Sequence, residues 1–517
     1  MKEIPDFLRE ILYKRGIKKE EEIEKFLFPS LNDIIEPNKI ANIEDASKEI
    51  LNSLKKKEKI FVYGDGDIDG IGGVFFILKF LKERDVNFNY YLTHRLEDYE
   101  IEENFVDYLL RENYKIIILI DCGISSYKFL KKCSENNIKA IVIDHHQTEI
   151  ENLPKGHFYI HPFFNSFKND FSATVLSFKL FQNLISNYPS SLSFKDFISI
   201  VGLSTLSENL NLIGENRIFV KEMLKDLKYS NIKGLNFLIS KYLNKEFLEI
   251  EDIKTKINPK LNSPGRFGKP EITLNLFLEE KEKEIEIIIK EIEQLDKKRY
   301  ELTQKIIKKI EEEKGFEDRF LVFENLPESL CGIIASRLSE KFGLPFFIAS
   351  KKGKIIKGSA RAPEDYDLYT EMKKIKDKFL SFGGHKTAIG FKFSTEVENQ
   401  IKEYWKSIKI EKKQDDEYFD IIFDIEDIKP EIFEYLNLLK PYGKGNNPPI
   451  FLSRNVLLKK IKKGEQEKYW VKKNVIFECE FLNSKKVEEG EKDIFYTPEI
   501  KEIDGYYKIS LKIKNFK

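Results

Sequence analysis

Three aspartates stand at alternate positions in the stretch FVYGDGDIDGIGG, residues 61–73. These residues, Asp65, Asp67 and Asp69, follow an apolar run typical of a strand and precede a stretch typical of a helix. At the N-terminus of a helix, small residues let a phosphate or a metal ion approach the backbone closely. The alternative is a polar β-turn, because Asp-Gly pairs are common in turns.

Two later apolar runs also end in acidic or imidazole side chains. IIILIDCGISS places Asp121 at the end of one run, and AIVIDHH places Asp144, His145 and His146 at the end of the next. Because parallel strands present their carboxyl ends at one edge of a sheet, we expect these side chains to meet there. Carboxylates mixed with imidazole suit Mn²⁺ or Mg²⁺ better than zinc. Two such ions, about 3.5–4 Å apart, would offset the repulsion among the carboxylates.

The elements that must position this site alternate between strands and helices. Candidate strands lie at 59–63, 87–92, 116–121 and 140–144. Charged, helix-like stretches separate them, which predicts an α/β domain with a parallel sheet. A long charged helix over 279–314 has one apolar stripe, which favours a helix bridging two domains over a coiled-coil dimer. A second α/β unit follows, and the last hundred residues have the short alternating strands of a small barrel.

Composition limits the classes of protein that the chain can belong to. A chain of 517 residues, at roughly 150 residues per domain, predicts about three domains. Lys plus Arg equals Asp plus Glu at 87, so any nucleic-acid site must come from local segregation of charge. The four cysteines form no CxxC pair, which argues against zinc or disulfides and suits a reducing cytoplasm. We expect a cytoplasmic protein, since neither a signal peptide nor a membrane span is evident.

The Asp-x-Asp-x-Asp-Gly motif, Asp121 and the Asp-His-His triplet resemble the DHH phosphoesterase superfamily, and further stretches resemble its RecJ family. The early Arg15-Gly16 pair belongs to this resemblance. The other stretches are IGENR (213–217), NPKLNSPGRFG (258–268), ESLCGIIASRL (328–338), GSAR (358–361), GGHKTAIG (383–390) and LLKPYGKGNNPPIF (438–451). So many motifs in the family's order are more specific than Asp-His-His alone.

The resemblance implies a division of the chain into five segments. We expect a helical lead-in, a DHH phosphoesterase domain, a connecting helical segment, a DHH-associated C-terminal domain and an oligonucleotide-binding (OB-like) barrel. These segments span residues 1–45, 46–255, 256–316, 317–405 and 415–517. The fold class is therefore two α/β domains joined by a long helix and followed by an all-β barrel.

The resemblance also assigns site residues. The expected metal ligands are Asp65, Asp67, Asp69, Asp121, His145 and Glu208. Asp67, Asp144 and His146 are the expected catalytic residues, with His146 against the scissile phosphate. The pocket for the 5′ end maps to Arg95, Arg266, Ser359 and Arg361, with His385 nearby. Arginine suits such a pocket because a guanidinium group binds two phosphate oxygens at once, although a single arginine more often forms a surface ion pair.

Two positions depart from the family pattern. Glu208, in LSENLNLIGENR, stands where the family has an aspartate, and the added methylene must bend or shift a metal ion by about an ångström. The stretch THRLEDYEIEEN keeps Arg95 but lacks both glycines of the family's loop. Both changes bear on catalytic rate and on the choice of substrate.

The barrel carries its own signal for nucleic-acid binding. RNVLLKKIKKGEQEKYWVKKN (454–474) contains eight basic residues around two aromatic ones. Cationic grooves with aromatic stacking surfaces hold single strands. We therefore predict DNA contacts from Lys459, Lys460, Lys462, Lys463, Tyr469 and Trp470. The alternative is a solvated hairpin whose aromatic side chains face the core.

Taken together, the residues and the resemblance predict a Mn²⁺- or Mg²⁺-dependent exonuclease that degrades single-stranded DNA 5′→3′ to mononucleotides. The resemblance implies work in recombination and repair beside a helicase and a single-strand-binding protein, and we expect a monomer. One alternative is a catalytically impaired scaffold that binds single strands. Another is a phosphodiesterase of short oligoribonucleotides or cyclic dinucleotides, which the barrel disfavours because tiny substrates need no such groove.

Overall fold

The computed structural model of the protein describes residues 4–84, 86–94, 100–167, 170–313, 319–408, 418–463, 466–481, 489–503 and 506–517. The chain forms two compact units. The larger unit comprises Ile35–Leu210 and Glu222–Ile410. The barrel unit comprises Met1–Ile34, Asn211–Lys221 and Glu411–Lys517, so that the division runs through helix α9 (Gly214–Asp226).

The larger unit begins with a five-stranded parallel sheet in the order β2-β1-β3-β4-β5. Its strands are β1 (Lys59–Gly64), β2 (Phe88–Leu92), β3 (Tyr114–Ile120), β4 (Lys139–Ile143) and β5 (Phe158–Ile160). The apolar runs were correctly predicted as the first four strands. β5 is only three residues long, too short for its apolar pattern to stand out.

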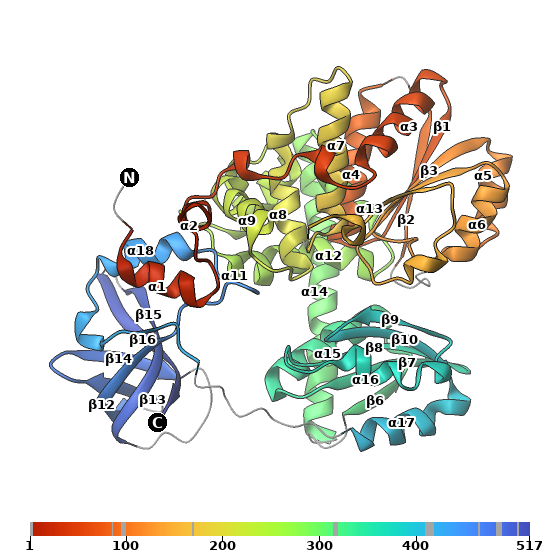
Figure 1. Ribbon diagram of the computed structural model, residues 1–517. Helices are drawn as coiled ribbons and strands as arrows, with labels where there is room; N and C mark the ends of the chain where they lie inside the picture. Colours follow the sequence, from red (N-terminus) through yellow and green to blue (C-terminus); the bar gives the residue numbers. More distant parts are fainter. Residues whose placement is uncertain are drawn as a thin grey trace. The chain divides into compact units, whose positions relative to one another are not determined.

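Helices cover both faces of this sheet (Figure 1). α5 (Phe105–Arg111) and α6 (Tyr127–Glu135) pack on one face, whose apolar core includes Phe61 and Leu119. α4 (Ile68–Lys82) and α7 (Ala173–Asn187) lie on the other face. The remaining helices of this part are α3 (Ile43–Lys55), α8 (Ile198–Ser207), α10 (Lys233–Tyr242), α11 (Ile250–Asp252), α12 (Asn258–Arg266) and α13 (Glu271–Leu278).

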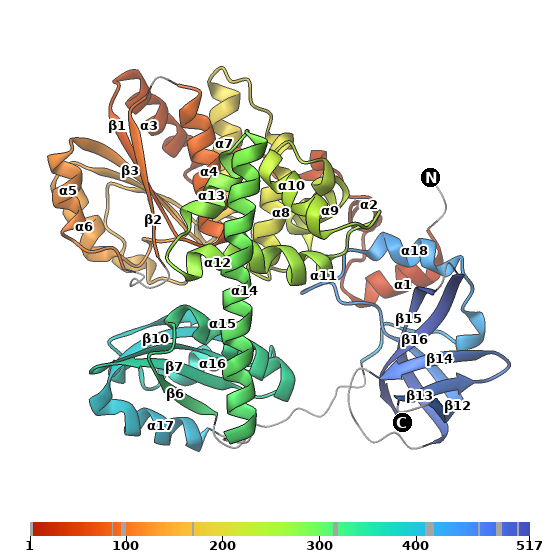
Figure 2. The ribbon, with the colours of Figure 1, turned by 180° about the vertical axis from the view of Figure 1, so that it is seen from behind.

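The long helix α14 (Glu282–Glu313) connects the first domain of the larger unit to its second (Figure 2). It packs against α10, α12 and α13 of the first domain and against α15 of the second. The second domain has a mixed sheet in the order β6-β7-β8-β10-β9. Its elements are β6 (Phe320–Glu324), α15 (Glu328–Phe342), β7 (Phe346–Lys352), β8 (Ile355–Arg361), α16 (Leu368–Lys373), β9 (Ser381–His385), β10 (Ala388–Ser394) and α17 (Glu398–Ser407). The bridging role predicted for this helix is confirmed.

The barrel unit contains a closed barrel in the order β12-β13-β14-β16-β15, because β15 pairs with β12. The short β11 (Ile421–Ile422) pairs with β12 in parallel. The barrel strands are β12 (Phe451–Lys463), β13 (Gln466–Lys472), β14 (Ile476–Phe481), β15 (Gly490–Ile503) and β16 (Tyr506–Phe516). The predicted fold class, two α/β domains and a C-terminal barrel, is confirmed.

The N-terminal helices α1 (Asp6–Lys14) and α2 (Glu20–Leu27) share one apolar core with the barrel and with α18 (Ile432–Leu439). Arg15 binds both carboxylate oxygens of Asp420, at 2.9 and 3.1 Å. The sequence had suggested that residues 1–45 lead into the first α/β domain. Instead, apolar side chains such as Leu8 and Ile11 find their partners in residues more than 400 positions away, which local patterns do not reveal.

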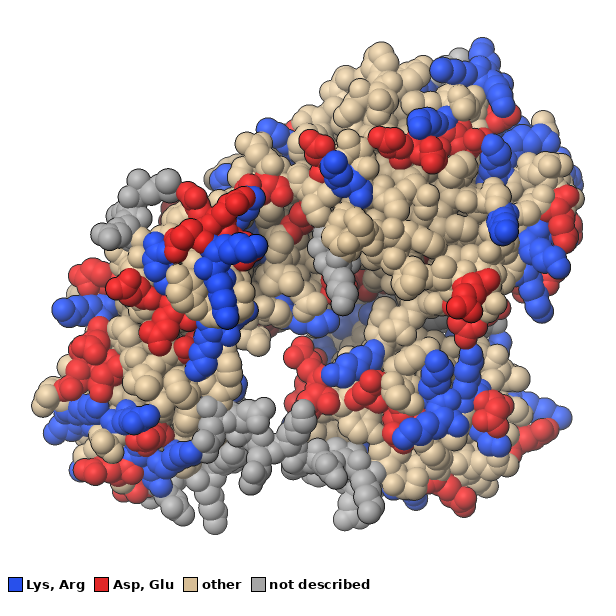
Figure 3. Space-filling view, viewed as in Figure 1, with Lys and Arg blue, Asp and Glu red and all other residues tan. Residues whose placement is uncertain are grey.

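The surface carries both signs of charge. On the face in Figure 3, Lys and Arg side chains are interspersed with Asp and Glu over both units. None of the helices in the described part of the chain is long and apolar enough to cross a membrane.

Candidate metal centre and substrate pocket

The candidate metal centre lies where β1, β3 and β4 end. Asp65, Asp121 and Asp144 each follow the last residue of one of these neighbouring parallel strands. Ligand atoms of Asp65, Asp67 and Asp121 lie within 4.8 Å of one another, and so do those of Asp121, His145 and His146. Asp121 belongs to both groups, an arrangement that suits one carboxylate between two cations.

Asp121 is buried and its backbone is in the left-handed region, with a φ of 59°. Such a conformation is costly for a residue other than glycine and is frequent at functional sites. Its Oδ1 lies 3.3 Å from Nε2 of His145, and neither atom has a hydrogen-bond partner among the described residues. Burial, and then the charges of the neighbouring carboxylates, raise the pKa of Asp121 well above its usual range. A buried carboxylate oxygen and a buried imidazole nitrogen that both lack hydrogen bonds are suited to bind a divalent cation.

Asp65 and Asp67 are oriented by local contacts. Oδ1 of Asp67 accepts hydrogen bonds from the amides of Asp69 and Gly70 and caps α4. Oδ1 of Asp65 accepts a 2.6 Å hydrogen bond from the hydroxyl of Thr93, the residue after β2. Sequence reasoning did not single out Thr93, since a threonine at a strand end has many ordinary roles.

Gly66, which separates these two aspartates, is required by close packing. A Cβ atom there would lie 2.2 Å from the carbonyl oxygen of Thr93. The carbonyl of Gly66 in turn lies 2.0 Å from the position of a Cβ on Gly265, in the NPKLNSPGRFG stretch. The two glycines therefore let α12 approach the turn that carries Asp65 and Asp67.

Asp69 is fully buried and has a different environment. Its Oδ1 accepts hydrogen bonds from the amide of Thr174 at 2.7 Å and the hydroxyl of Ser204 at 2.6 Å, and its Oδ2 accepts one from the amide of Ala173 at 2.9 Å. The carboxylate thus caps α7 and holds α8 beside it. Oδ2 also lies 3.5 Å from Nε2 of His145, so Asp69 borders the centre without belonging to either ligand group.

Asp144 holds His146 in place. Its Oδ1 accepts hydrogen bonds from the amides of His145 and His146 and lies 2.8 Å from Nδ1 of His146. Burial alone would raise the pKa of Asp144, but the adjacent His146 holds it below its usual range. Burial alone would lower the pKa of His146, but Asp144 raises it to about 9. In the metal-free protein, this raised pKa favours the protonated imidazole of His146.

His161 supports the same histidine from the next strand. It follows β5, and its Nε2 donates to the carbonyl of His146 at 3.0 Å, while its Nδ1 accepts from the amide of Phe163. Burial lowers the pKa of His161, so the neutral form is favoured. His161 was not predicted as a site residue, because β5 itself was not expected.

Glu208 follows the last residue of α8, close enough that its charge raises the pKa values of both Asp121 and His146. It lies outside the two ligand groups. The preceding residue, Ser207, accepts a hydrogen bond from the side-chain amide of Asn262, whose oxygen accepts from the amide of Ile68. Asn262 thus links the end of α8 to the start of α4 and fixes the place of Glu208.

The residues expected to hold the 5′ end gather at the first turns of α15. Arg266 donates to the carbonyl of Ser329, and the hydroxyl of Ser329 donates to the carbonyl of Arg266, both at 2.7 Å. Ser359 and Arg361 flank Gly332, where a Cβ would lie 2.9 Å from a guanidinium nitrogen of Arg361.

His385 of β9 reaches the metal centre. Its ring lies 5.9 Å from that of His146 and 6.0 Å from that of His145. The sheet of the second domain therefore contributes a side chain to the edge where the first sheet presents its aspartates. Arg95 is outside the described residues.

In the barrel, the expected DNA-binding residues divide between two faces. Tyr469 packs against the core and contacts Phe481, with ring centroids 5.0 Å apart. Trp470 pairs across the strands with the exposed Lys459, and Lys460 pairs with Tyr469. The alternation of a strand therefore places Trp470 and Lys459 on the outer face. The side chains of Lys462 and Lys463 are outside the described ones.

Comparison with known proteins agrees with this architecture. Residues 59–201 match the N-terminal domain of the DHH family, residues 318–410 match the DHHA1 domain, and residues 419–515 match the RecJ OB domain. Residues 59–201 therefore form a domain of the DHH type. The three matched segments follow one another in the order that the sequence resemblance predicts.

Its relatives include single-stranded-DNA-specific exonucleases RecJ. That of Bacillus subtilis is 26% identical over 512 residues, covering 94% of this chain and 64% of the relative. That of Thermus thermophilus is 26% identical over 426 residues, covering 80% and 61%. The chain thus spans less than two thirds of the length of these two relatives.

Solved structures share the fold. The crystal structure of Thermus thermophilus RecJ in complex with Mn²⁺ has a TM-score of 0.82 at 20% identity, over 99% of this chain and 76% of that one. An exonuclease RecJ bound to manganese has a TM-score of 0.60 at 23% identity, over 71% of this chain and 94% of that one.

Proposed function

We propose that this protein is a metal-dependent exonuclease that hydrolyses single-stranded DNA from the 5′ end to mononucleotides. The observation that carries the proposal is the pair of ligand groups that share Asp121, at the edge of a parallel sheet. Two divalent cations bound there, Mn²⁺ or Mg²⁺, would activate a water molecule and stabilise the leaving oxygen. The activity named for the RecJ relatives supports the choice of substrate.

The protein's own residues would orient the phosphate. His146, held by Asp144, would donate a hydrogen bond to a non-bridging oxygen of the scissile phosphate. His385 lies at stacking distance from His146 and would border the same phosphate. Thr93 would keep Asp65 in one orientation, and Asn262 would do so for the segment of Glu208.

Recognition of the 5′ end would come from the second α/β domain. Ser359 and Arg361 stand at alternate positions of β8 and therefore face the same side, toward α15. A terminal phosphate placed there would receive hydrogen bonds from both side chains, and Arg266 would border it from α12. Arg95, which follows β2 in the sequence, is proposed for the same pocket.

The barrel would retain the rest of the strand. Lys459 and Trp470 share its outer face, where a base could stack on the indole and a phosphate could meet the ammonium group. We further propose that the protein acts in the cytoplasm, in recombination and repair, as a monomer beside a helicase and a single-strand-binding protein. The four free, buried cysteines are compatible with a reducing compartment.

The test uses 5′-phosphorylated, 3′-labelled single-stranded DNA with Mn²⁺, with Mg²⁺ and with EDTA. Loss of nucleotides from the 5′ end that requires both metal and Asp121 is the expected result, and Asp121→Ala is the control. Tight binding without cleavage in either metal would contradict the proposal and favour the binding scaffold, with Glu208 as the first residue to change to aspartate. Cleavage restricted to the shortest oligoribonucleotides would favour the phosphodiesterase.

A further inference from the structure

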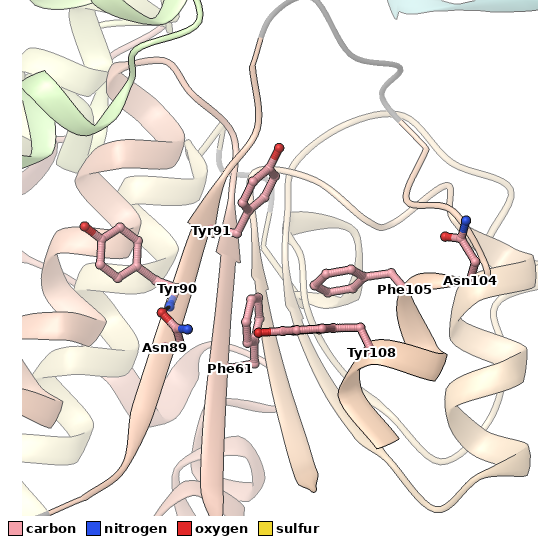
Figure 4. A pocket seen from close by; sticks show the side chains of 7 residues that line it. All are labelled: Phe61, Asn89, Tyr90, Tyr91, Asn104, Phe105 and Tyr108. Atoms are coloured by element: carbon pink, nitrogen blue, oxygen red, sulfur yellow. Dashed lines mark hydrogen bonds between the residues drawn. The ribbon is translucent and has the colours of Figure 1, made fainter. Parts of the chain in front are cut away.

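An open pocket of about 450 Å³ lies on the first sheet, between β2 and α5 (Figure 4). Four aromatic side chains form most of its wall: Phe61, Tyr91, Phe105 and Tyr108. Tyr90, Asn89 and Asn104 complete the lining. Among the described residues that line it, none is charged.

The aromatic rings form a preformed wall. Phe105 and Tyr108 stand three residues apart on α5, with nearly parallel rings 5.4 Å from each other. Phe61 meets both of them edge-on, at 5.4 and 5.9 Å, and Tyr114 supports Phe61 from below at 5.2 Å. Because these rings already contact one another, a planar ligand could stack on their outer faces without rearranging them.

Exposed amides stand at the rim. Asn89 lies on β2 and Asn104 immediately precedes α5, so they approach the pocket from two different elements. A side-chain amide offers both donors and an acceptor, the combination that the edge of a nucleobase also presents. Oδ1 of Asn89 accepts a hydrogen bond from the amide of Tyr90, and Nδ2 of Asn104 donates one to Glu102. Aromatic walls with amide groups at the edge suit an uncharged heterocycle better than a phosphate or a carboxylate.

The pocket is in line with the metal centre. Asn89, Tyr91 and Thr93 alternate along one strand direction and share a face, and Phe61, Tyr63 and Asp65 do so on the neighbouring strand. The hydroxyl of Thr93 contacts Asp65. Two strand residues, about 6.6 Å, separate Tyr91 from Thr93, and four, about 13 Å, separate Phe61 and Asn89 from Asp65 and Thr93. A nucleotide whose phosphate lies at Asp65 could place its base against Tyr91, at the end of the pocket nearest the metal centre.

We propose that this pocket binds one nucleobase of the DNA strand, from the nucleotide at or next to the bond that is cut. The inference rests on the proposed function, because it takes the substrate to be single-stranded DNA. Stacking on the aromatic wall would hold the nucleotide while a phosphate of the strand lies at the metal centre. Since every base has a flat face, the pocket would favour unpaired bases without selecting a sequence. Paired bases of a duplex could not enter it.

The test measures binding in EDTA, where hydrolysis does not interfere. A short 5′-phosphorylated oligonucleotide carries one abasic residue, moved in turn through the positions nearest its 5′ end. Fluorescence anisotropy of a 3′ label gives the affinity for each oligonucleotide. In the wild-type protein we expect one position where loss of the base weakens binding about tenfold, which is the size of one stacking contact.

Two variants close the pocket from opposite rims, Asn104→Trp and Asn89→Trp. Each should weaken binding of intact DNA about tenfold and erase the effect of the abasic residue at that one position. Having two variants guards against one that fails to fold. Glu103→Trp is the matched control, because it introduces the same side chain at the exposed neighbour of Asn104, outside the lining. It should keep the wild-type profile.

Two results would overturn the inference: a flat abasic profile in the wild-type protein, or a position effect that both rim variants retain. Hydrolysis is then measured separately with Mn²⁺. A wild-type protein that shows the position effect but does not cut DNA would contradict the proposed exonuclease and leave the base pocket standing. A protein that cuts DNA but has a flat profile would contradict the pocket alone.

Discussion

Replacing Asp69 with asparagine should destabilise the larger unit, with or without metal. Both carboxylate oxygens accept hydrogen bonds, from two backbone amides at the start of α7 and from the hydroxyl of Ser204. Asparagine has one oxygen, so its NH₂ group must face one of the buried donors. One charge-assisted hydrogen bond is lost, which lowers the free energy of unfolding by about 1.5–3 kcal/mol. The other two hydrogen bonds weaken, which lowers it by about 1 kcal/mol each.

The sum is about 4 kcal/mol, a large part of the 5–15 kcal/mol that stabilises a typical domain. It corresponds to a fall in Tm of about 5 °C for a unit of this size. The assay is thermal unfolding followed by circular dichroism in EDTA, so that metal binding contributes nothing. An Asp69→Asn protein that melts at the wild-type temperature in EDTA, yet loses Mn²⁺-dependent hydrolysis, would refute this reasoning and leave Asp69 as a ligand only.

Three other perturbations test neighbouring parts of the structure. Asp121→Asn should stabilise the metal-free protein at neutral pH, since the buried carboxylate has a raised pKa and an Oδ1 without a hydrogen-bond partner among the described residues. A raised carboxyl pKa means that the folded state binds more protons than the unfolded state, so wild-type stability in EDTA should rise as the pH falls toward that pKa. Asp121→Asn should reduce this slope, and an unchanged slope would contradict the assignment. Thr93→Val should lower kcat about tenfold, because the hydrogen bond that orients Asp65 is lost, and Thr93→Ser should restore the rate. A Thr93→Val enzyme with wild-type kcat would show that Asp65 needs no such support. Arg15→Met should destabilise the barrel unit by about 3 kcal/mol, because it leaves the buried Asp420 without its cation. Hydrogen exchange should then accelerate in β12 and α1 and stay unchanged in β1 and β3, whereas uniform acceleration would count against a separate barrel unit.

The central sheet and its acidic edge could be predicted because their signals are local. Each of the first strands is an apolar run, and Asp65, Asp121 and Asp144 follow three of them directly. Parallel pairing alone then brings these residues to one edge. The long helix α14 was predictable for the same reason, since its apolar stripe repeats at helical spacing.

The remaining features depend on contacts between distant residues. Thr93 and His161 matter through single hydrogen bonds to Asp65 and to the carbonyl of His146, which no spacing in the sequence encodes. The helices α1 and α2 pack with a barrel at the other end of the chain. Tyr469 and Trp470 are adjacent, yet they occupy opposite faces of β13, and only the register of the barrel decides which of them faces the core.

The most direct test of the metal centre is the number of Mn²⁺ ions that the protein binds, measured by isothermal titration calorimetry. Because Asp121 belongs to both ligand groups, we predict two ions per wild-type chain and weakened binding of both in Asp121→Asn. The matched control, Asp107→Asn on the surface of α5, should bind two ions as the wild type does. A wild-type chain that binds one ion or none, or an Asp121→Asn chain that still binds two with wild-type affinity, would contradict a two-metal centre built around Asp121.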